Sequence, residues 1–366
     1  MMEQVRVLHV VTYMGRGGLE TMLMNYFRNI DRSKVQFDFL VHRDFEADYD
    51  KEILSLGGRI YHLPQLNPFS RKYHKALDSF FSEHPYQIVH SHLDCMSAYP
   101  LSHAKKASVP VRIAHAHNKS QDKNIKYPLK ILSKSLIPEY ATHLFACGEE
   151  AGQWMFNGRQ FQILYNTIDS SRYIYSEQIR REVREELHLG NKLVIGHVGR
   201  FSPQKNHGFI IRLFYELQKR KPDSILILTG DGRNRQHIEK MVQELDLGRK
   251  VIFTGIRSDV NRLMQAMDVF LFPSLYEGLP VTMIEAQAAG LPCVISENVP
   301  EETIITDLVS RLALEAPVSE WIDKILKSGQ MEMERRNQII QIRNAGYDIK
   351  ENAERLEHFY MRAGVR

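Results

Sequence analysis

The chain has 366 residues, which is long enough for two domains of ordinary size. Hydrophobic residues make up 43% and charged residues 25%, as in an ordinary globular protein, and the net charge of +4 is spread over both halves, so nothing indicates nucleic-acid binding. Because there is neither a signal-peptide pattern nor an apolar run of about eighteen residues, we expect a cytoplasmic protein without a membrane span.

Short β-branched or apolar runs alternate with longer amphipathic segments, a pattern typical of βα units and a buried parallel sheet. In the first half the strands are predicted at residues 5–11, 35–41, 59–63, 87–92, 111–116 and 143–147. In the second half they are predicted at residues 192–199, 224–230, 250–255, 268–273 and 292–296. The sequence therefore predicts an α/β protein with two doubly wound parallel sheets. Loops at the carboxyl ends of such strands bind ligands, and we expect both halves to face a common cleft with them.

The first predicted strand leads into "YMGRGGLE", residues 13–20, which contains Gly15, Gly17 and Gly18. Glycine lets the backbone approach a ligand closely, and the helix that follows favours an anion at its start. The pattern differs from the GxGxxG dinucleotide fingerprint. A phosphate-binding loop and a plain tight turn both fit this segment.

Two histidine pairs occur at predicted strand ends, in "IVHSHLD" (His90 and His92) and in "RIAHAHN" (His115 and His117). Alternate residues of a strand point to the same side, so each pair shares a face. Neither pair has a fixed carboxylate or cysteine partner, and a zinc site is not predicted. We interpret these histidines as structural residues or as the polar lining of a cleft.

Residues 118–138 combine an apolar stripe with basic side chains, namely Lys119, Lys123, Lys126, Lys130 and Lys134. This composition fits a helix that touches an anionic membrane surface. It also fits an amphipathic helix that packs on its own domain with solvated lysines, which we favour slightly.

A domain boundary is predicted between residues 163 and 176, where the strand pattern gives way to Asn, Asp, Ser and Tyr. We assign residues 1–168 to a first domain and 169–346 to a second. The closing amphipathic segment, about 347–366, is expected to pack back on the first domain.

In the second half, "GHVGRFSPQKNH" (196–207) places Arg200 and Lys205 just beyond a strand. Two loop cations at this position suit a diphosphate and a departing leaving group. Solvated loop charges are the alternative. Further on, "TGIRSDV" offers Gly255 and Ile256 as backbone against which a base can lie, while Asp259 is expected to cap the next helix.

The segment "SLYEGLPVTMIEAQAAGLPCV", residues 274–294, reads as loop, helix and strand. Pro280 suits the first helical position, and unpaired N–H groups at a helix start attract phosphate. Glu277 would repel phosphate, so we interpret it as an acceptor for hydroxyl groups beside the phosphates. Glu285, at least one helical turn further on, is interpreted as an acceptor for hydroxyl groups from another part of the same ligand. A nucleotide sugar has this arrangement of groups. The alternative is that both glutamates are solvated surface residues.

The cysteines Cys95, Cys147 and Cys293 are far apart in apolar surroundings and lack metal-ligand spacing. They are predicted to be buried thiols in a reducing compartment.

Taken together, these segments resemble the retaining glycosyltransferases of family 4, of the capsular and exopolysaccharide type, which have the two-domain, Rossmann-like GT-B fold. The most specific match is "EGLPVTMIE", the Glu-x7-Glu element of the family, supported in order by "GRGGLE", "YNTID", "GRFSPQKNH" and "TGIRSDV". One departure is "SENVPEETIITDLVSRLALEAP", which contains none of the glycines that often follow the last strand motif in the family.

The resemblance implies roles for individual residues. Gly17 and Gly18 would lie near the donor diphosphate, Arg200 and Lys205 would clamp it, and Glu285 would hold the ribose. Glu277 would contact the transferred sugar, and either His115 or His117 would contact it too. The rest of the implied donor site consists of Gly15, Asn166, Gly255, Ile256, Gly278, Leu279, Pro280 and Val281.

The implied reaction moves a hexosyl unit from a nucleoside diphosphate sugar, UDP-linked, to a glycan or lipid-linked acceptor with retention of configuration. Neither a metal nor an organic cofactor is implied. A nicotinamide dehydrogenase would share the doubly wound halves, but the glycine fingerprint is poor. A non-catalytic sugar-nucleotide sensor would use the same residues without turnover.

Overall fold

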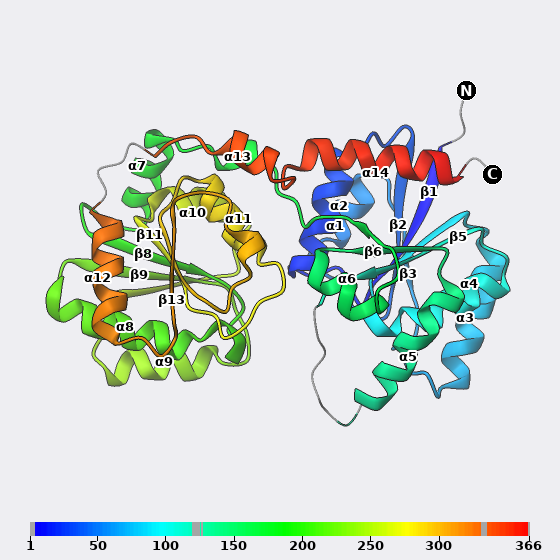
Figure 1. Ribbon diagram of the computed structural model, residues 1–366, viewed down its shortest axis with the longest axis horizontal. Helices are drawn as coiled ribbons and strands as arrows, with labels where there is room; N and C mark the ends of the chain where they lie inside the picture. The colour runs from blue at the N-terminus through cyan, green and yellow to red at the C-terminus, as the bar shows by residue number, and fades with distance from the viewer. Residues whose placement is uncertain (1–3, 119–124, 126, 331–334, 365–366) are drawn as a thin grey trace. The chain divides into compact units, whose positions relative to one another are not determined.

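The computed structural model describes residues 4–118, 125, 127–330 and 335–364. The chain forms two compact units, residues 1–167 with 349–366 and residues 168–348. Each unit contains one parallel β-sheet with helices on its faces (Figure 1). No described helix has the length and apolar character that crossing a membrane requires.

The sheet of the first unit has the strand order β3-β2-β1-β4-β5-β6-β7. Its strands are β1 (Val5–Val10), β2 (Val35–Val41), β3 (Ile60–His62), β4 (Ile88–Ser91), β5 (Val111–Ala116), β6 (His143–Ala146) and β7 (Gln162–Ile163). All neighbours are parallel, and the order reverses between β1 and β4. This reversal is the switch point at which doubly wound sheets bind ligands.

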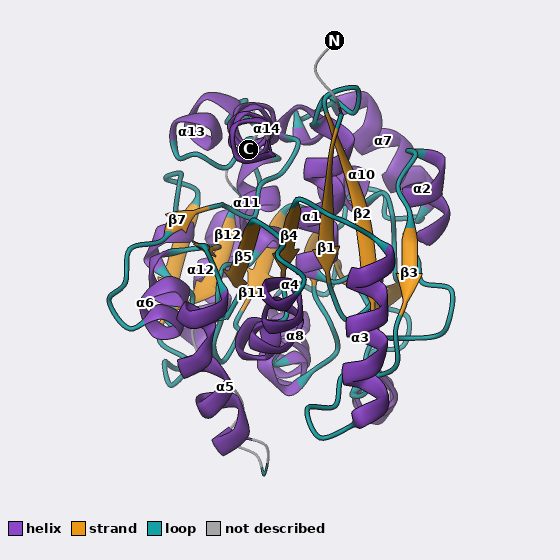
Figure 2. Cartoon of the chain, turned by 90° about the vertical axis from the view of Figure 1, so that its right-hand side faces the viewer, coloured by secondary structure: helices purple, strands orange, loops and turns teal. Residues whose placement is uncertain are grey.

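Helices cover both faces of this sheet (Figures 1 and 2). They are α1 (Gly18–Asn29), α2 (Asp50–Ser55), α3 (Arg71–Glu83), α4 (Ala98–Lys106), α5 (Tyr127–Tyr140), α6 (Glu149–Phe156), α14 (Ile349–Gly364) and the 3₁₀ turn η1 (Asp94–Ser97). Successive strand residues point to opposite faces, so Val7 packs in one core and Leu8 in the other. Leu356 and Tyr360 of α14 join the core of Val7, so the C-terminal helix belongs to the first unit.

The sheet of the second unit has the order β10-β9-β8-β11-β12-β13, again parallel, with its reversal between β8 and β11. The strands are β8 (Leu193–Val198), β9 (Ser224–Thr229), β10 (Val251–Gly255), β11 (Val269–Phe272), β12 (Cys293–Ser296) and β13 (Val309–Leu312). The helices and 3₁₀ turns are η2 (Ser170–Tyr173), α7 (Glu177–Glu186), η3 (Pro203–Lys205), α8 (His207–Arg220), α9 (Arg235–Glu244), α10 (Val260–Ala266), α11 (Val281–Ala288), η4 (Glu301–Thr303), α12 (Val318–Gly329) and α13 (Ile339–Asn344). Ile195, Leu226 and Leu271 pack with α8, α9 and α12 on one face.

The predicted α/β class with two doubly wound parallel sheets is confirmed. Each of the eleven predicted strands is present, with ends within one residue of the prediction. The sequence missed β7 and β13, which lie at sheet edges. An edge strand is covered less completely and pairs on one side, and residues 309–311 of β13 are only half-buried, so it lacks a continuous apolar run.

The three cysteines are free and buried, as predicted. Burial raises the pKa of the Cys95 thiol to about 12. It also raises the pKa of the Cys293 thiol.

Candidate active site

The loops that follow β8 and β11 meet at the switch point of the second unit. Lys205, from the first loop, forms an ion pair with Glu277, from the second, with Nζ and Oε1 2.7 Å apart. Gln204 donates from Nε2 to the other carboxylate oxygen at 3.1 Å. The Lys205 side chain is 15% exposed and that of Glu277 5%, so this is a largely buried ion pair.

Glycines allow the neighbouring loops to come this close. Gly230, after β9, has φ +129°, and a Cβ there would lie 2.2 Å from the carbonyl oxygen of Gly199. A Cβ on Gly199 would in turn lie 3.2 Å from Cδ of Lys205. Gly230 therefore shapes the loop after β8, which carries Lys205.

The helix start beside Glu277 has the character of an anion site. Helix α11 begins at Val281, with Pro280 at the N-cap, so Pro280 stands one position before the first helical position predicted for it. No described residue accepts a hydrogen bond from the N–H groups of Gly278, Leu279 or Val281. Unpaired donors at the positive end of a helix are suited to a phosphate oxygen.

Glu285 lies inside α11 and has a different partner from Glu277. The hydroxyl of Tyr173 donates to its Oε1 at 2.6 Å. Burial raises the pKa of the Glu285 carboxyl, while the hydrogen bond from Tyr173 and the positive charge of Arg172 lower it. Glu285 remains half-buried, so its carboxylate is still partly accessible.

The other site residues predicted in this unit are exposed or lie at the ends of strands and helices. Arg200 is exposed, and its side chain makes no hydrogen bond or ion pair with any described residue. Gly255 ends β10 with φ +67°, and Ile256 beside it is 57% exposed. Asp259 stands at the N-cap of α10, but its carboxylate pairs with Arg257 at 2.6 Å, so the capping hydrogen bond predicted for it is absent.

The predicted residues of the first unit also lie at carboxyl ends of strands. Gly17 is the N-cap of α1, and Gly18, its first residue, is exposed with open space around it. A Cβ on Gly15 would clash with the ring of Tyr13 at 2.4 Å. Asn166 is 8% exposed, and its Oδ1 has no hydrogen-bond partner among the described residues.

The two candidate histidines differ in accessibility. His115 is 1% exposed, whereas His117 is half-buried and follows β5 directly. The backbone N–H of His117 donates to Oδ1 of Asp94 at 2.8 Å, and Asn118 donates to Oδ2 at 2.6 Å. Asp94 thus holds the turn that carries His117.

Five histidines lie close together in this unit. His9, His90 and His92 form one group whose ring nitrogens lie within 4.8 Å of one another, and His92, His115 and His117 form a second. Both groups consist of imidazoles alone, without a carboxylate or thiolate. Several of these nitrogens are instead hydrogen-bonded to each other.

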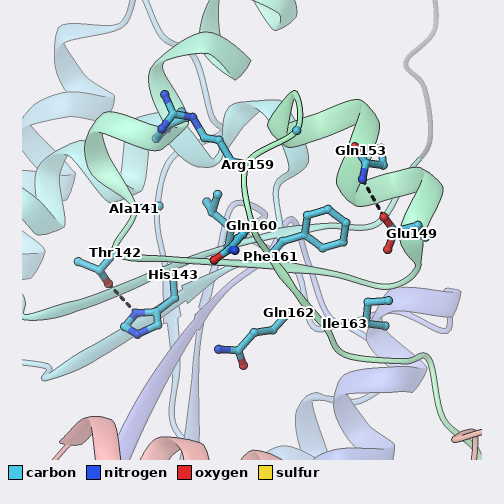
Figure 3. Close-up of a pocket in the computed structure, with 13 residues that line it drawn as sticks. Ala141, Thr142, His143, Glu149, Gln153, Arg159, Gln160, Phe161, Gln162 and Ile163 are labelled. Atoms are coloured by element: carbon cyan, nitrogen blue, oxygen red, sulfur yellow. Dashed lines mark hydrogen bonds between the residues drawn. The ribbon is translucent and has the colours of Figure 1, made fainter.

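Two surface hollows lie away from these residues. One, of about 770 Å³, is lined mainly by the segments entering β6 and β7, including His143, Arg159 and Phe161 (Figure 3). Another, of about 900 Å³, lies beside α7 and is lined by Arg180 and Arg184, which are already paired with Asp268. None of the predicted site residues lines either hollow.

Sequence reasoning missed three contacting residues. Gln204 and Tyr173 bond to the two glutamates, and His9 bonds to His92. Gln204 lies in the segment 196–207, directly before Lys205, so its position in this loop was predictable from the sequence. Tyr173 is 112 residues from Glu285, so no local signal connects the two.

The chain is similar to several known proteins. The model of the family "Glycosyl transferases group 1" matches residues 178–344. EpsF of Bacillus subtilis (strain 168), whose name assigns it to the glycosyltransferases, is 39% identical over 98% of this chain and 96% of its own. The capsular polysaccharide biosynthesis glycosyltransferase CapH of Staphylococcus aureus is 24% identical over 98% of this chain and 99% of its own. The structure of Anabaena HepE in complex with UDP and glucose has a TM-score of 0.81 at 18% identity, covering 97% of this chain and 99% of HepE.

The two Rossmann-like parallel-sheet domains give this chain the GT-B fold. The chain belongs to the group 1 glycosyltransferases, of the capsular and exopolysaccharide type that its motifs resemble.

Proposed function

We propose that this enzyme transfers a hexosyl unit from a UDP-sugar to a glycan or lipid-linked acceptor in cell-surface polysaccharide biosynthesis, with retention of configuration. The observation that carries the proposal is the Lys205–Glu277 pair beside the unpaired N–H groups at the start of α11. A cation and backbone donors suit a diphosphate, and the adjoining carboxylate suits a sugar hydroxyl.

The leaving group gains negative charge as the sugar departs. Lys205, Arg200 and the N–H groups of Gly278 and Val281 would stabilise that charge, and one preorganised donor of this kind is worth about 3 kcal/mol. Glu277 would hold the transferred sugar and Glu285 the ribose. We assign no protein group as general base, because in the proposed mechanism the leaving phosphate oxygen takes the acceptor proton.

Donor and acceptor classes are supported by the names of relatives. HepE was solved with UDP and glucose. An Escherichia coli relative, 26% identical over 60% of this chain, is named as a galactosyltransferase that uses UDP-Gal and a diphosphoundecaprenol-linked acceptor. These names describe other proteins. The identities of the sugar that this enzyme transfers and of its acceptor are therefore the first properties to determine.

Calorimetric titration of the wild type with UDP, GDP and their sugars tests the donor directly. We expect UDP to bind, Lys205→Met to weaken binding at least tenfold, and Lys219→Met on the surface of α8 to leave it unchanged. The anomeric proton coupling in the product reports retention, and we expect chelator treatment to leave the rate unchanged. Failure of every nucleotide to bind, or inversion of the product, would contradict the proposal.

We also propose a peripheral contact between α5 and an anionic membrane surface. In α5, Ile131 is 37% and Leu132 61% exposed, close to Lys130 and Lys134. Lys119, Lys123 and Lys126 of the predicted basic segment lie outside the described residues. Apolar side chains flanked by lysines bind the boundary of an anionic bilayer.

Flotation with phosphatidylglycerol-containing vesicles tests this contact. Leu132→Glu should reduce binding several-fold, while Leu54→Glu on α2, where Leu54 is 59% exposed, should not. Equal flotation of both variants and the wild type would refute a role for α5. Equal binding of the wild type to purely zwitterionic vesicles would refute an electrostatic contribution of the lysines.

A further inference from the structure

Three of the five clustered histidines form one continuous hydrogen-bonded chain. Nδ1 of His9, on β1, lies 3.0 Å from Nε2 of His92, which follows β4. Nδ1 of the same His92 ring lies 3.0 Å from Nε2 of His117, which follows β5. The two contacts run in the same sense, Nδ1 to Nε2, through adjacent strands of the sheet.

All three rings are neutral near pH 7. Burial lowers the pKa of His9 and of His117 to about 3, and it lowers the pKa of His92 well below the ordinary value. A neutral imidazole has one nitrogen that donates and one that accepts. Each ring of the chain therefore carries a single ring proton, on either Nδ1 or Nε2.

This restriction links the tautomers of the three rings. If His117 carries its proton on Nε2, it donates to Nδ1 of His92, so the proton of His92 must be on Nε2. That proton is donated to Nδ1 of His9, which must then be protonated on Nε2 too. If His117 is protonated on Nδ1, the same argument in reverse places all three protons on Nδ1. A mixed set would leave two lone pairs or two N–H groups facing each other at 3.0 Å.

The two ends of the chain have different surroundings. Nε2 of His9 is buried, has no partner among the described residues, and its ring packs against Phe37 and Phe39. Nδ1 of His117 is also buried and lacks a described partner, but the residue as a whole is half-buried and follows the carboxyl end of β5. A buried polar atom without a partner is a candidate for hydrogen bonding to a bound group. Because His117 is the partly exposed end of the chain, a ligand hydroxyl would reach the chain there.

We propose that His9 and His92 are positioning residues for His117, and that the three imidazoles share one tautomer. A ligand hydroxyl that donates to Nδ1 of His117 matches the Nε2-protonated state of the whole chain. A ligand oxygen that accepts from Nδ1 matches the other state. The functional part rests on the proposed function and assigns to His117 the sugar contact that the family resemblance implies for either His115 or His117, whereas the shared tautomer does not depend on it.

A second chain in the same layer provides a control. His90 lies between the hydroxyl of Tyr360, 2.6 Å from its Nδ1, and Nδ1 of His115, 3.1 Å from its Nε2. Neither hydrogen bond of this chain involves His92 or His117, although the rings of His90 and His92 are stacked 4.3 Å apart. His90→Phe therefore removes a buried imidazole of the same layer without breaking the chain of His117.

Nitrogen NMR of the protein labelled with [¹⁵N]histidine tests the shared tautomer, because two-bond ¹H–¹⁵N correlations distinguish protonated from unprotonated ring nitrogens. Single His→Phe variants assign the signals. At pH 7.5 we expect His9, His92 and His117 to show the same tautomer, before and after addition of UDP-sugar. We expect His92→Phe to release His117 into a mixture of tautomers, and His90→Phe to leave it unchanged. Different tautomers among the three wild-type rings would overturn the proposal, and that measurement requires no variant to fold.

Kinetics test the positioning role. The amide of His92→Asn can replace Nδ1 and keep a partner for His117, whereas His92→Phe cannot. We expect the donor KM to rise about tenfold in His92→Phe and to stay within about threefold of the wild type in His92→Asn, a tenfold change being 1.4 kcal/mol. Equal KM values for both would overturn the positioning role. If the wild type transfers no sugar, the proposed function fails while the NMR result still decides the shared tautomer.

Discussion

The buried ion pair between Lys205 and Glu277 allows a quantitative prediction of stability. Its atoms are 2.7 Å apart and its side chains 15% and 5% exposed. Removing one partner of such a pair costs roughly 3–5 kcal/mol, because the other charge stays buried. Lys205 is not fully enclosed, so we expect about 3 kcal/mol for Lys205→Met. We expect about 2 kcal/mol for Glu277→Gln, whose amide oxygen still accepts from Nζ.

A double-mutant cycle isolates the pair. The double variant should cost about 2–3 kcal/mol, less than the sum of the single costs of about 5 kcal/mol, which leaves a coupling of about 2–3 kcal/mol. The matched control is Lys219–Glu216 on the surface of α8, with 2.6 Å between its atoms but side chains 54% and 41% exposed. Its coupling should be within about 0.5 kcal/mol. Urea unfolding of all variants gives both numbers, and an inner coupling no larger than the outer one would refute the argument.

The same single variants show how the charge of Lys205 and the charge of Glu277 each affect UDP binding. Glu277 neutralises Lys205 and would repel the diphosphate, and two like charges about 8 Å apart repel by about 2 kcal/mol at an effective dielectric constant of ~20. Glu277→Gln should therefore bind UDP about thirtyfold more tightly while its transfer rate falls. Lys205→Met should bind at least tenfold more weakly. Calorimetry measures both, and weaker UDP binding by Glu277→Gln would contradict the proposed placement of the diphosphate.

Three further outcomes are expected. Tyr173→Phe removes the hydroxyl that donates to Glu285, so the pKa of Glu285 rises further. Initial-rate measurements should then show that the donor KM of this variant increases more steeply than that of the wild type as the pH falls from 8 to 6. Gly230→Ala should cost at least about 3 kcal/mol in thermal unfolding, because its Cβ would lie 2.2 Å from the Gly199 oxygen at φ +129°, whereas Gly18→Ala should change stability by at most about 1 kcal/mol. Burial depresses the pKa of several histidines, so stability should be full above pH 6.5 and fall below it, as the unfolded chain takes up protons, by up to about 1.4 kcal/mol per histidine and pH unit.

Each of these outcomes has a clear opposite. Parallel pH profiles for Tyr173→Phe and the wild type would show that the hydroxyl does not control Glu285. Equal stability of the two alanine variants would show that the loop adjusts around Gly230. A free energy of unfolding that stays constant between pH 7.5 and 5.5 would show that the histidines are not buried neutral.

The strands were predictable because a parallel sheet buries both faces of each strand. Such strands read as continuous apolar runs, as in β9 and β11, whose residues are all buried. Edge strands do not have this signal, and β13, with three half-buried residues, was missed for that reason.

The candidate site was predictable only where the chemistry lies in one loop. Arg200, Lys205, Glu277 and Glu285 stand in motifs that sequence alone can mark. Their partners depend on which strands become neighbours: Lys205 reaches Glu277 because β8 and β11 are adjacent across the switch point.

The hydrogen-bonded chain of His9, His92 and His117 also depends on which strands become neighbours. Spacing alone indicates that His90 and His92 share a face, as do His115 and His117. The chain of hydrogen bonds requires in addition that β1 lies beside β4 and β4 beside β5, with His9 opposite His90 in register. A one-residue slip of β1 would turn His9 to the opposite face and remove its contact with His92. The linked tautomers are therefore a property of strand register, and a variant that shifts β1 should uncouple His9 from the remaining pair of His92 and His117.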